Sequence, residues 1–145
     1  MDINKIRRSS MYLLLCGLIL LLAACTNEPA PENEIYIAKV SDFEDNIFTN
    51  TQNQSIGLLG GDLRIAGIYD QGAKSKSSLD SIVSSISGGT GDQVEKIFTN
   101  VEIKTKEDKY YITADEGISL TFTKIGERII KDENGIEYTS PKYSN

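Results

Sequence analysis

The feature that most constrains the fold is an alternation of apolar and polar residues that fills the last third of this 145-residue chain. Strands with one buried and one wet face produce this pattern. Four segments carry it: 101–106, 110–114, 118–123 and 136–138. Turn sequences separate them: Glu107-Asp108, Asp115-Glu116-Gly117 and Asn134-Gly135. The pattern predicts four consecutive antiparallel strands that form a meander.

The same alternation predicts which side chains are buried. The predicted apolar face carries Val101, Ile103, Tyr110, Ile112, Ile118, Leu120, Phe122, Ile136 and Tyr138. The predicted wet face carries Glu102, Lys104, Thr113, Thr121 and Thr123. Such a sheet needs something to cover its apolar face.

A helix is the clearest element outside the meander. Ser77 and Asp80 form an N-terminal box, and Gly88-Gly89 supplies a stop, so the helix is expected over about 78–87. Apolar residues fall on one face at helical spacing: Leu79, Ile82, Val83 and Ile86. Serines occupy another: Ser81, Ser84 and Ser85. A serine face is typical of a solvated surface, and it also allows a close partner to pack.

Residues 35–48, which precede this helix, fit two alternative structures. Residues 35–40 suit a short strand, and Ser41-Asp42-Phe43-Glu44 has the form of a capping box for a helix to about Phe48. One longer helix from Glu34 fits the spacing of Tyr36, Val40, Phe43 and Ile47 equally well. Residues 49–55 are expected to be a loop and 62–69 a strand. Gly60-Gly61 favours a turn over a phosphate-binding loop, because no Lys-Ser/Thr pair follows at the required spacing.

These elements predict an α+β fold in one domain over residues 35–145. The sheet is expected to be an antiparallel meander of about four to six strands. It would be accompanied by the helix at about 78–87 and, in one of the alternatives, by a short N-terminal helix.

Composition limits the chemistry of the chain. There is no His and no Trp, both methionines lie within the first 24 residues, and the only cysteines are Cys16 and Cys25. Soft-metal sites and Ser-His-Asp or Cys-His pairs are therefore not expected. We expect no enzyme, no cofactor and no metal, with carboxylate chemistry or a Ser-Lys pair as the catalytic options that remain.

Carboxylates cluster in the predicted turns at Glu107-Asp108, Asp115-Glu116 and Asp132-Glu133. Oxygen-rich turns can hold calcium, but Asp132-Glu133-Asn134-Gly135 stops short of an EF-hand loop, so solvated hairpin tips are expected instead. Paired carboxylates also serve glycosidases, although the aromatic platforms that bind sugars are missing.

The first 24 residues have the order of a bacterial export signal. Lys5, Arg7 and Arg8 give a positive start, residues 11–22 are apolar without a charge, and Leu22-Ala23-Ala24-Cys25 closes the run. This last tetrapeptide resembles the lipobox of bacterial lipoproteins. The resemblance implies cleavage before Cys25, a diacylglyceryl lipid on its sulfur and acyl chains such as palmitate.

Two other outcomes of this signal are an ordinary cleavage that leaves Cys25 unmodified and an uncleaved anchor. The apolar run is shorter than a comfortable span of about 20 residues. Cys16 follows bulky Leu15 and is expected to leave with the signal peptide. Residues 25–34 then form a tether rich in proline and glutamate. The resemblance implies an extracytoplasmic location, in the outer membrane if the organism has one, because Thr26 is not a retention aspartate.

The net charge limits the kinds of partner that the protein is expected to bind. Removing residues 1–24 takes away three basic side chains and one acidic one, which changes the formal net charge from −6 to −8. This acidity argues against nucleic acid. The expected contacts are the membrane, through the N-terminal lipid, and an envelope or host protein. Tyr111, on the predicted wet face, and Tyr143 are candidates for such a partner surface.

The predicted function is a non-enzymatic binding or interaction module. An alternative is a carrier of a small apolar ligand, since residues 97–139 with a helix resemble lipocalin-like bacterial barrels, although the Gly-x-Trp signature is missing. The tetrapeptide Ile47-Phe48-Thr49-Asn50 recurs at Ile97-Phe98-Thr99-Asn100. Both duplication and chance explain this recurrence.

Overall fold

The computed structural model describes residues 35–44 and 46–141. The signal, Cys16, Cys25, the tether and Tyr143 lie outside the described residues. The chain divides into two units, Met1–Glu34 and Ile35–Asn145, and all that follows concerns the second. Within the described residues no helix has the length and hydrophobicity needed to cross a bilayer.

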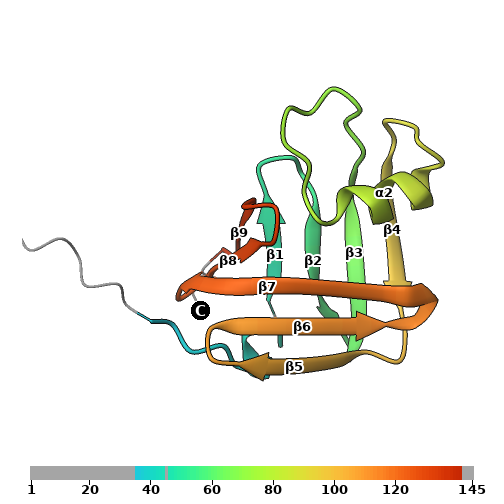
Figure 1. The fold of residues 1–145 in the computed structure, drawn as a ribbon. Coiled ribbons are helices and arrows are strands. Elements are labelled where there is room, and N and C mark those ends of the chain that lie inside the picture. Colours follow the sequence, from blue (N-terminus) through green and yellow to red (C-terminus); the bar gives the residue numbers. More distant parts are fainter. Residues whose placement is uncertain (1–34, 45, 142–145) are drawn as a thin grey trace, which may run out of the picture. The chain divides into compact units, whose positions relative to one another are not determined.

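The described unit is a single curled antiparallel sheet with one α-helix (Figure 1). The strands of its first half are β1 (Ile47–Asn50), β2 (Ser55–Leu59), β3 (Asp62–Ile68) and β4 (Gln93–Phe98). Those of the second half are β5 (Glu102–Lys106), β6 (Lys109–Ala114), β7 (Ile118–Gly126), β8 (Ile129–Asp132) and β9 (Glu137–Thr139). Helix α2 (Asp80–Ser87) and the short 3-10 helices η1 (Val40–Asp42) and η2 (Asp115–Gly117) complete it.

The strand order is β4-β3-β2-β1-β9-β8-β7-β6-β5. Each half is a meander, and the two halves meet where β1 pairs with β9, at Thr49 opposite Thr139 and Asn50 opposite Tyr138. The sheet curls so that β5 to β7 lie across β1 to β4 in the manner of a half-barrel (Figure 1). The edge strands β4 and β5 are joined by a short connection and do not pair.

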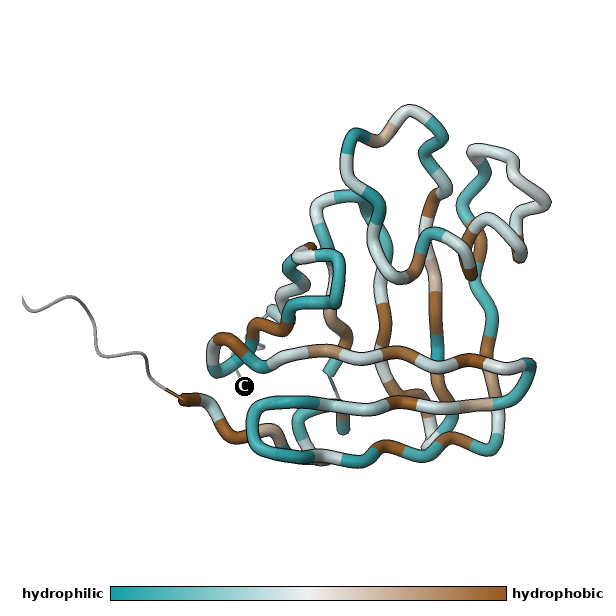
Figure 2. Tube along the Cα trace, viewed as in Figure 1, coloured by the Kyte–Doolittle hydropathy of each residue, from teal (hydrophilic) through white to brown (hydrophobic). Residues whose placement is uncertain are grey.

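The predicted α+β class fits broadly, but the sheet has nine strands instead of four to six. The alternation in the last third of the chain is confirmed and is visible along the tube of Figure 2. Tyr110, Ile112, Phe122 and Tyr138 are fully buried, while Glu102, Lys104 and Thr113 are exposed. Gly135 has φ 84° in the predicted turn between β8 and β9.

The predictions for residues 35–59 are wrong in most respects. Residues 35–39 form no strand, the expected helix is the single turn η1, and β1 begins at Ile47. The reason lies in burial, because Phe43 and Phe48 enter the core whereas Val40 and Ile47 face solvent, which no helical face allows. The Gly60-Gly61 turn is confirmed, with both glycines at positive φ between β2 and β3.

The core is filled by aromatic and branched side chains from both halves of the sheet. Phe43 contacts Phe48 and Tyr110 with ring centroids 5.1 and 5.2 Å apart, and Phe122 contacts Tyr138 edge-on at 5.3 Å. Such pairs add to the stabilisation that burial of their surface provides. The inside of the curled sheet is thus a packed core around these rings.

The predicted helix is confirmed at Asp80–Ser87, and it closes at Gly88, whose φ is 65°. Leu79 and Val83 are fully buried against the sheet, while Ile82 and Ile86 are only half-buried. The apolar face of α2 is therefore divided between the core and a more open place beside it.

Candidate functional site

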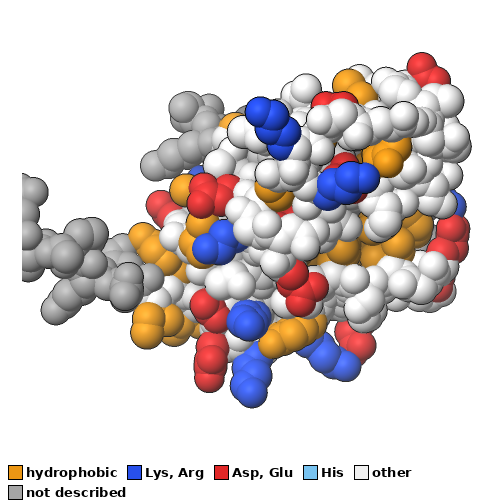
Figure 3. Space-filling view, turned by 45° about the horizontal axis from the view of Figure 1, so that its top comes forward, with side chains coloured by type: hydrophobic (Ala, Val, Ile, Leu, Met, Phe, Trp, Pro, Cys, Tyr) orange, Lys and Arg blue, Asp and Glu red, His pale blue; other side chains and the backbone are white. Residues whose placement is uncertain are grey.

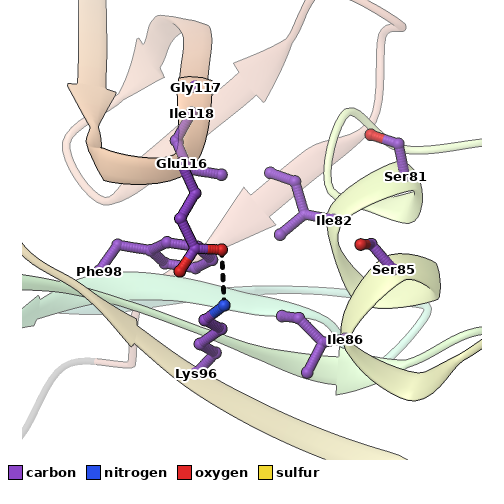
Figure 4. Close-up of a pocket in the computed structure, with 9 residues that line it drawn as sticks. All are labelled: Ser81, Ile82, Ser85, Ile86, Lys96, Phe98, Glu116, Gly117 and Ile118. Atoms are coloured by element: carbon purple, nitrogen blue, oxygen red, sulfur yellow. Dashed lines mark hydrogen bonds and ion pairs between the residues drawn. The ribbon is translucent and has the colours of Figure 1, made fainter.

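The open place is a cleft of about 280 Å³ between α2, the edge strand β4 and the start of β7 (Figure 4). We call it the α2–β4 cleft. Its lining residues are Ser81, Ile82, Ser85, Ile86, Lys96, Phe98, Glu116, Gly117 and Ile118. Figure 3 shows hydrophobic side chains gathered in a band at the surface on this part of the molecule.

The topology of the sheet creates this cleft. In a closed barrel β4 would pair with a neighbouring strand on its free side, but here it is an edge. The gap is closed at one end, where the Asp115 amide donates to the Thr99 carbonyl oxygen at 3.0 Å. Beyond this link α2 stands beside the gap and leaves the cleft open to solvent.

The corner that closes the gap is held by the Asp115 carboxylate. The Thr99 hydroxyl donates to it, and the Asn100 amide donates to both of its oxygens at 2.9 and 3.0 Å. These hydrogen bonds, from Thr99 first and then from Asn100, lower the pKa of Asp115 below its ordinary value. The carboxylate therefore acts as a structural acceptor at the end of the cleft.

The cleft has an apolar floor and a polar rim. Phe98 and Ile118 are buried beneath it, and Ile82 and Ile86 point into it from α2 (Figure 4). The hydroxyls of Ser81 and Ser85 lie on the helix side of the rim. Across from them Lys96 and Glu116 form an ion pair with 2.6 Å between Nζ and Oε2. Most of the exposed lining is polar, so the cleft suits a small molecule that combines polar groups with an apolar part.

The helix beside the cleft is fixed at its N-terminal end by buried hydrogen bonds. We call these residues the α2 anchor: Asn50, Gln54, Ser77, Asp80, Asp132 and Tyr138. Gln54 donates through Nε2 to Asp80 at 2.7 Å and accepts from Asn50 at 3.1 Å. Gly67 makes room for it, since a Cβ at that position would come within 2.8 Å of the Gln54 side chain.

The predicted box at the helix start is confirmed in part. The Ser77 amide donates to Asp80 Oδ2 at 2.9 Å, and the Leu79 amide donates to the Ser77 hydroxyl at 3.1 Å. Both Ser77 and Asp80 are buried. The box therefore serves the core as well as the helix end.

Asp132 corrects the prediction of a solvated hairpin tip, because only 5% of it is exposed. One oxygen accepts from the amides of Asn134 and Ile136 at 3.0 and 2.8 Å. The other accepts from the Ser78 amide at 2.7 Å and from the Tyr138 hydroxyl at 3.2 Å. Protein donors thus occupy the positions that a calcium ion would need.

Tyr138 completes the α2 anchor. Burial is the main cause that raises the pKa of Tyr138 to about 12, and the nearby Asp132 charge adds to it. The phenol is therefore a neutral donor at physiological pH. Among the described residues, no group of acidic, cysteine or histidine side chains is arranged to hold a metal ion.

A second, smaller hollow of about 200 Å³ lies near η1 and the end of β7. At its edge Asp42 accepts from Lys124 Nζ at 2.8 Å, from the Lys39 amide at 2.9 Å and from the Tyr110 hydroxyl. Burial raises the pKa of Asp42, but these hydrogen bonds lower it more, so the net pKa is below the ordinary value. Asp42 and Lys124 are therefore engaged in holding η1 to the sheet.

The remaining sequence candidates are scattered. Glu107 lies in the β5–β6 turn, far along the sheet from the cleft, and Tyr111 is 40% exposed on the outer face of β6. Of the carboxylate pairs, only Asp115-Glu116 reaches the cleft. The first copy of the tetrapeptide is the whole of β1 and the second lies at the end of β4, with Phe48 and Phe98 inward and Ile47 and Ile97 outward.

Sequence reasoning missed β4 and with it Lys96. Val94, Lys96 and Phe98 share the inner face of this strand, so a charged residue stands where alternation demands an apolar one. The serine face of α2 was the one available signal, and Ser81 and Ser85 do border the cleft. Comparison with protein-family models, curated proteins and solved structures gave no match.

Proposed function

We propose that this protein is a lipid-anchored, extracytoplasmic lipoprotein of the bacterial envelope that acts as a non-enzymatic binding module. The lipid anchor rests on Leu22-Ala23-Ala24-Cys25. The binding role rests on the α2–β4 cleft, which is the single observation that carries it. In a diderm organism the proposed address is the outer membrane.

The lipid anchor is tested with Cys25→Ser in the full chain. Wild-type protein is expected to incorporate labelled palmitate and to enter the detergent phase on phase separation. The variant is expected to lose the label and stay in the aqueous phase, because a hydroxyl does not replace the thiol in this modification. Equal partitioning and labelling of both proteins would exclude the anchor.

The binding role follows from how the cleft is built. Ile82 and Ile86 pack against the core but are only half-buried, whereas Val83 of the same helix is fully buried, so α2 leaves part of two branched side chains exposed at the cleft. A ligand that covers the exposed part of these two side chains gains the free energy of their burial. Neither serine hydroxyl bonds to Lys96 in the described residues, so the cleft holds no assembled Ser-Lys pair.

The cleft is tested with a neutral apolar fluorophore, N-phenyl-1-naphthylamine. The protein used is the whole mature chain with Cys25→Ser, which needs no detergent. Ser85→Trp would fill the cleft from an exposed helix position and is expected to weaken fluorophore binding at least tenfold. Ser119→Trp, on the exposed outer face of β7, is the matched control and should bind like the parent.

A second candidate function is the lipocalin-like carrier, and the curled sheet favours it. A carrier would place its ligand inside the curve, where Tyr110, Phe122 and Tyr138 now fill the space. Fluorophore binding that survives Ser85→Trp would favour this interior site. Loss of binding in Ser85→Trp alone would favour the cleft, and no binding by the parent would exclude both.

A further inference from the structure

Lys96 occupies an unusual position for a cation. It lies on β4 directly opposite Ile65, whose side chain is fully buried, and between the inward-facing Val94 and Phe98. Lysine at a core-facing position normally costs free energy unless its charge has a partner or reaches water. Lys96 meets both conditions only because the cleft opens beside it.

The contacts of Lys96 show how its charge is held. Its Nζ lies 2.6 Å from Glu116 Oε2 and 5.2 Å from the centre of the Phe98 ring, on the cleft floor. The side chain of Glu116 is 58% exposed, against 38% for that of Lys96. The carboxylate is therefore the outer partner and the ammonium the inner one.

Glu116 is easily replaced as a partner. It is a non-glycine residue at φ 59°, a backbone conformation that costs free energy, and it lies in the single turn η2 at the rim. An exposed ion pair contributes little to stability, so exchange of this carboxylate for another costs little. Replacement of Lys96 by a foreign cation would instead have to displace the more enclosed group.

We infer that the α2–β4 cleft takes a small molecule with an apolar body and a single carboxylate. This inference rests on the proposed binding function of the cleft. The ligand carboxylate takes the place of the Glu116 carboxylate on Lys96, and its apolar body lies along Ile82 and Ile86. The freed Glu116 side chain turns to water.

The test uses three probes of equal length and different charge: octanoate, octanol and octylammonium. Binding to the whole mature chain with Cys25→Ser is measured by NMR titration, below the concentration at which the probes aggregate. Octanoate is expected to bind about threefold more tightly than octanol, because its carboxylate takes over a charge-assisted hydrogen bond from the exposed Glu116. Octylammonium is expected to bind most weakly.

Three variants assign the effect to residues. Lys96→Met keeps the apolar stem and is expected to abolish the preference for octanoate over octanol. Glu116→Gln removes the competing carboxylate and is expected to tighten octanoate binding several-fold. Lys104→Met is the matched control, because Lys104 pairs with Glu102 at 3.0 Å on the outer face, away from the cleft.

The outcomes separate this inference from the function on which it rests. Equal affinities for octanoate and octanol, tightest binding of octylammonium, or equal losses in Lys96→Met and Lys104→Met would each overturn the carboxylate ligand. Binding of the neutral fluorophore would then still support the cleft. If neither the fluorophore nor any probe binds, the proposed function fails together with the inference.

Discussion

The two sides of helix α2 solve the burial of polar groups in different ways. At its N-terminal end the α2 anchor buries Asp80 and Asp132 and gives each carboxylate donors at hydrogen-bond distance. Along its open side Lys96 and Glu116 keep their charges partly in water and form one ion pair. The difference shows that the protein fixes where α2 begins and leaves its cleft side partly open to water.

The largest effect on stability is expected at the α2 anchor. Asp132→Ala should lower the free energy of unfolding by about 4 kcal/mol, because it leaves donors of the hairpin, of Ser78 before α2 and of Tyr138 without an acceptor. Glu133→Ala is the control at the next residue, which is exposed, and should change stability by less than about 0.5 kcal/mol. Urea unfolding measures both, and similar losses would contradict the comparison.

Truncation of apolar side chains on α2 sharpens the contrast. Leu79→Ala should cost about 3 kcal/mol, since Leu79 is fully buried and leaves a cavity. Ile86→Ala should cost about 1 kcal/mol, since Ile86 is half-buried beside an existing opening. Thermal and urea unfolding of the two variants provide the measurement. A larger loss in Ile86→Ala would show that the cleft side belongs to the core.

The α2 anchor should also contribute less stability at alkaline pH. The pKa of Tyr138 is about 12 in the folded state against about 10 in the unfolded chain, so the folded form binds this proton more tightly. Its contribution is complete below pH 10 and is lost as pH rises toward 12, by about 2 kcal/mol. In Tyr138→Phe the fall in stability over this range should be smaller. Equal alkaline losses in both proteins would refute this.

The smallest effect is expected at the cleft. Lys96→Met and Lys104→Met should each change the free energy of unfolding by less than about 0.5 kcal/mol, because both lysines belong to partly exposed ion pairs. Urea unfolding at low and high salt measures this. A loss above 2 kcal/mol in Lys96→Met alone would make Lys96 a structural residue.

The parts of the fold that the sequence predicts are those where alternation and turn chemistry agree. Ile112, Leu120 and Phe122 alternate with polar neighbours between strong turns, and the meander follows. In β2 the pattern is broken by Gly57, which is a glycine because a Cβ there would come within 2.6 Å of the Asn46 carbonyl oxygen. Such a requirement depends on a neighbouring strand and leaves no local signal.

The cleft was not predicted from the sequence for a related reason. In β4 a lysine points inward and Ile97 outward, which reverses the usual pattern at the strand that lines the proposed site. A departure from local rules is what a functional site often requires. The burial of Asp132 was missed because two of its donors, the Ser78 amide and the Tyr138 hydroxyl, lie outside the turn, and the turn sequence does not indicate that the segment before α2 packs over it.

The seam between the two halves of the sheet has a further consequence for how the chain assembles. Every other strand pairing joins consecutive strands, but the β1–β9 pairing brings together Thr49 and Thr139, about ninety residues apart. The entropy lost in closing a loop grows with its length, so this pairing carries the greatest closure cost in the sheet. Asn50 and Tyr138 face each other across it and also belong to the α2 anchor. Residues that fix the N-terminal end of α2 therefore also stabilise the strand pairing with the greatest loop-closure entropy.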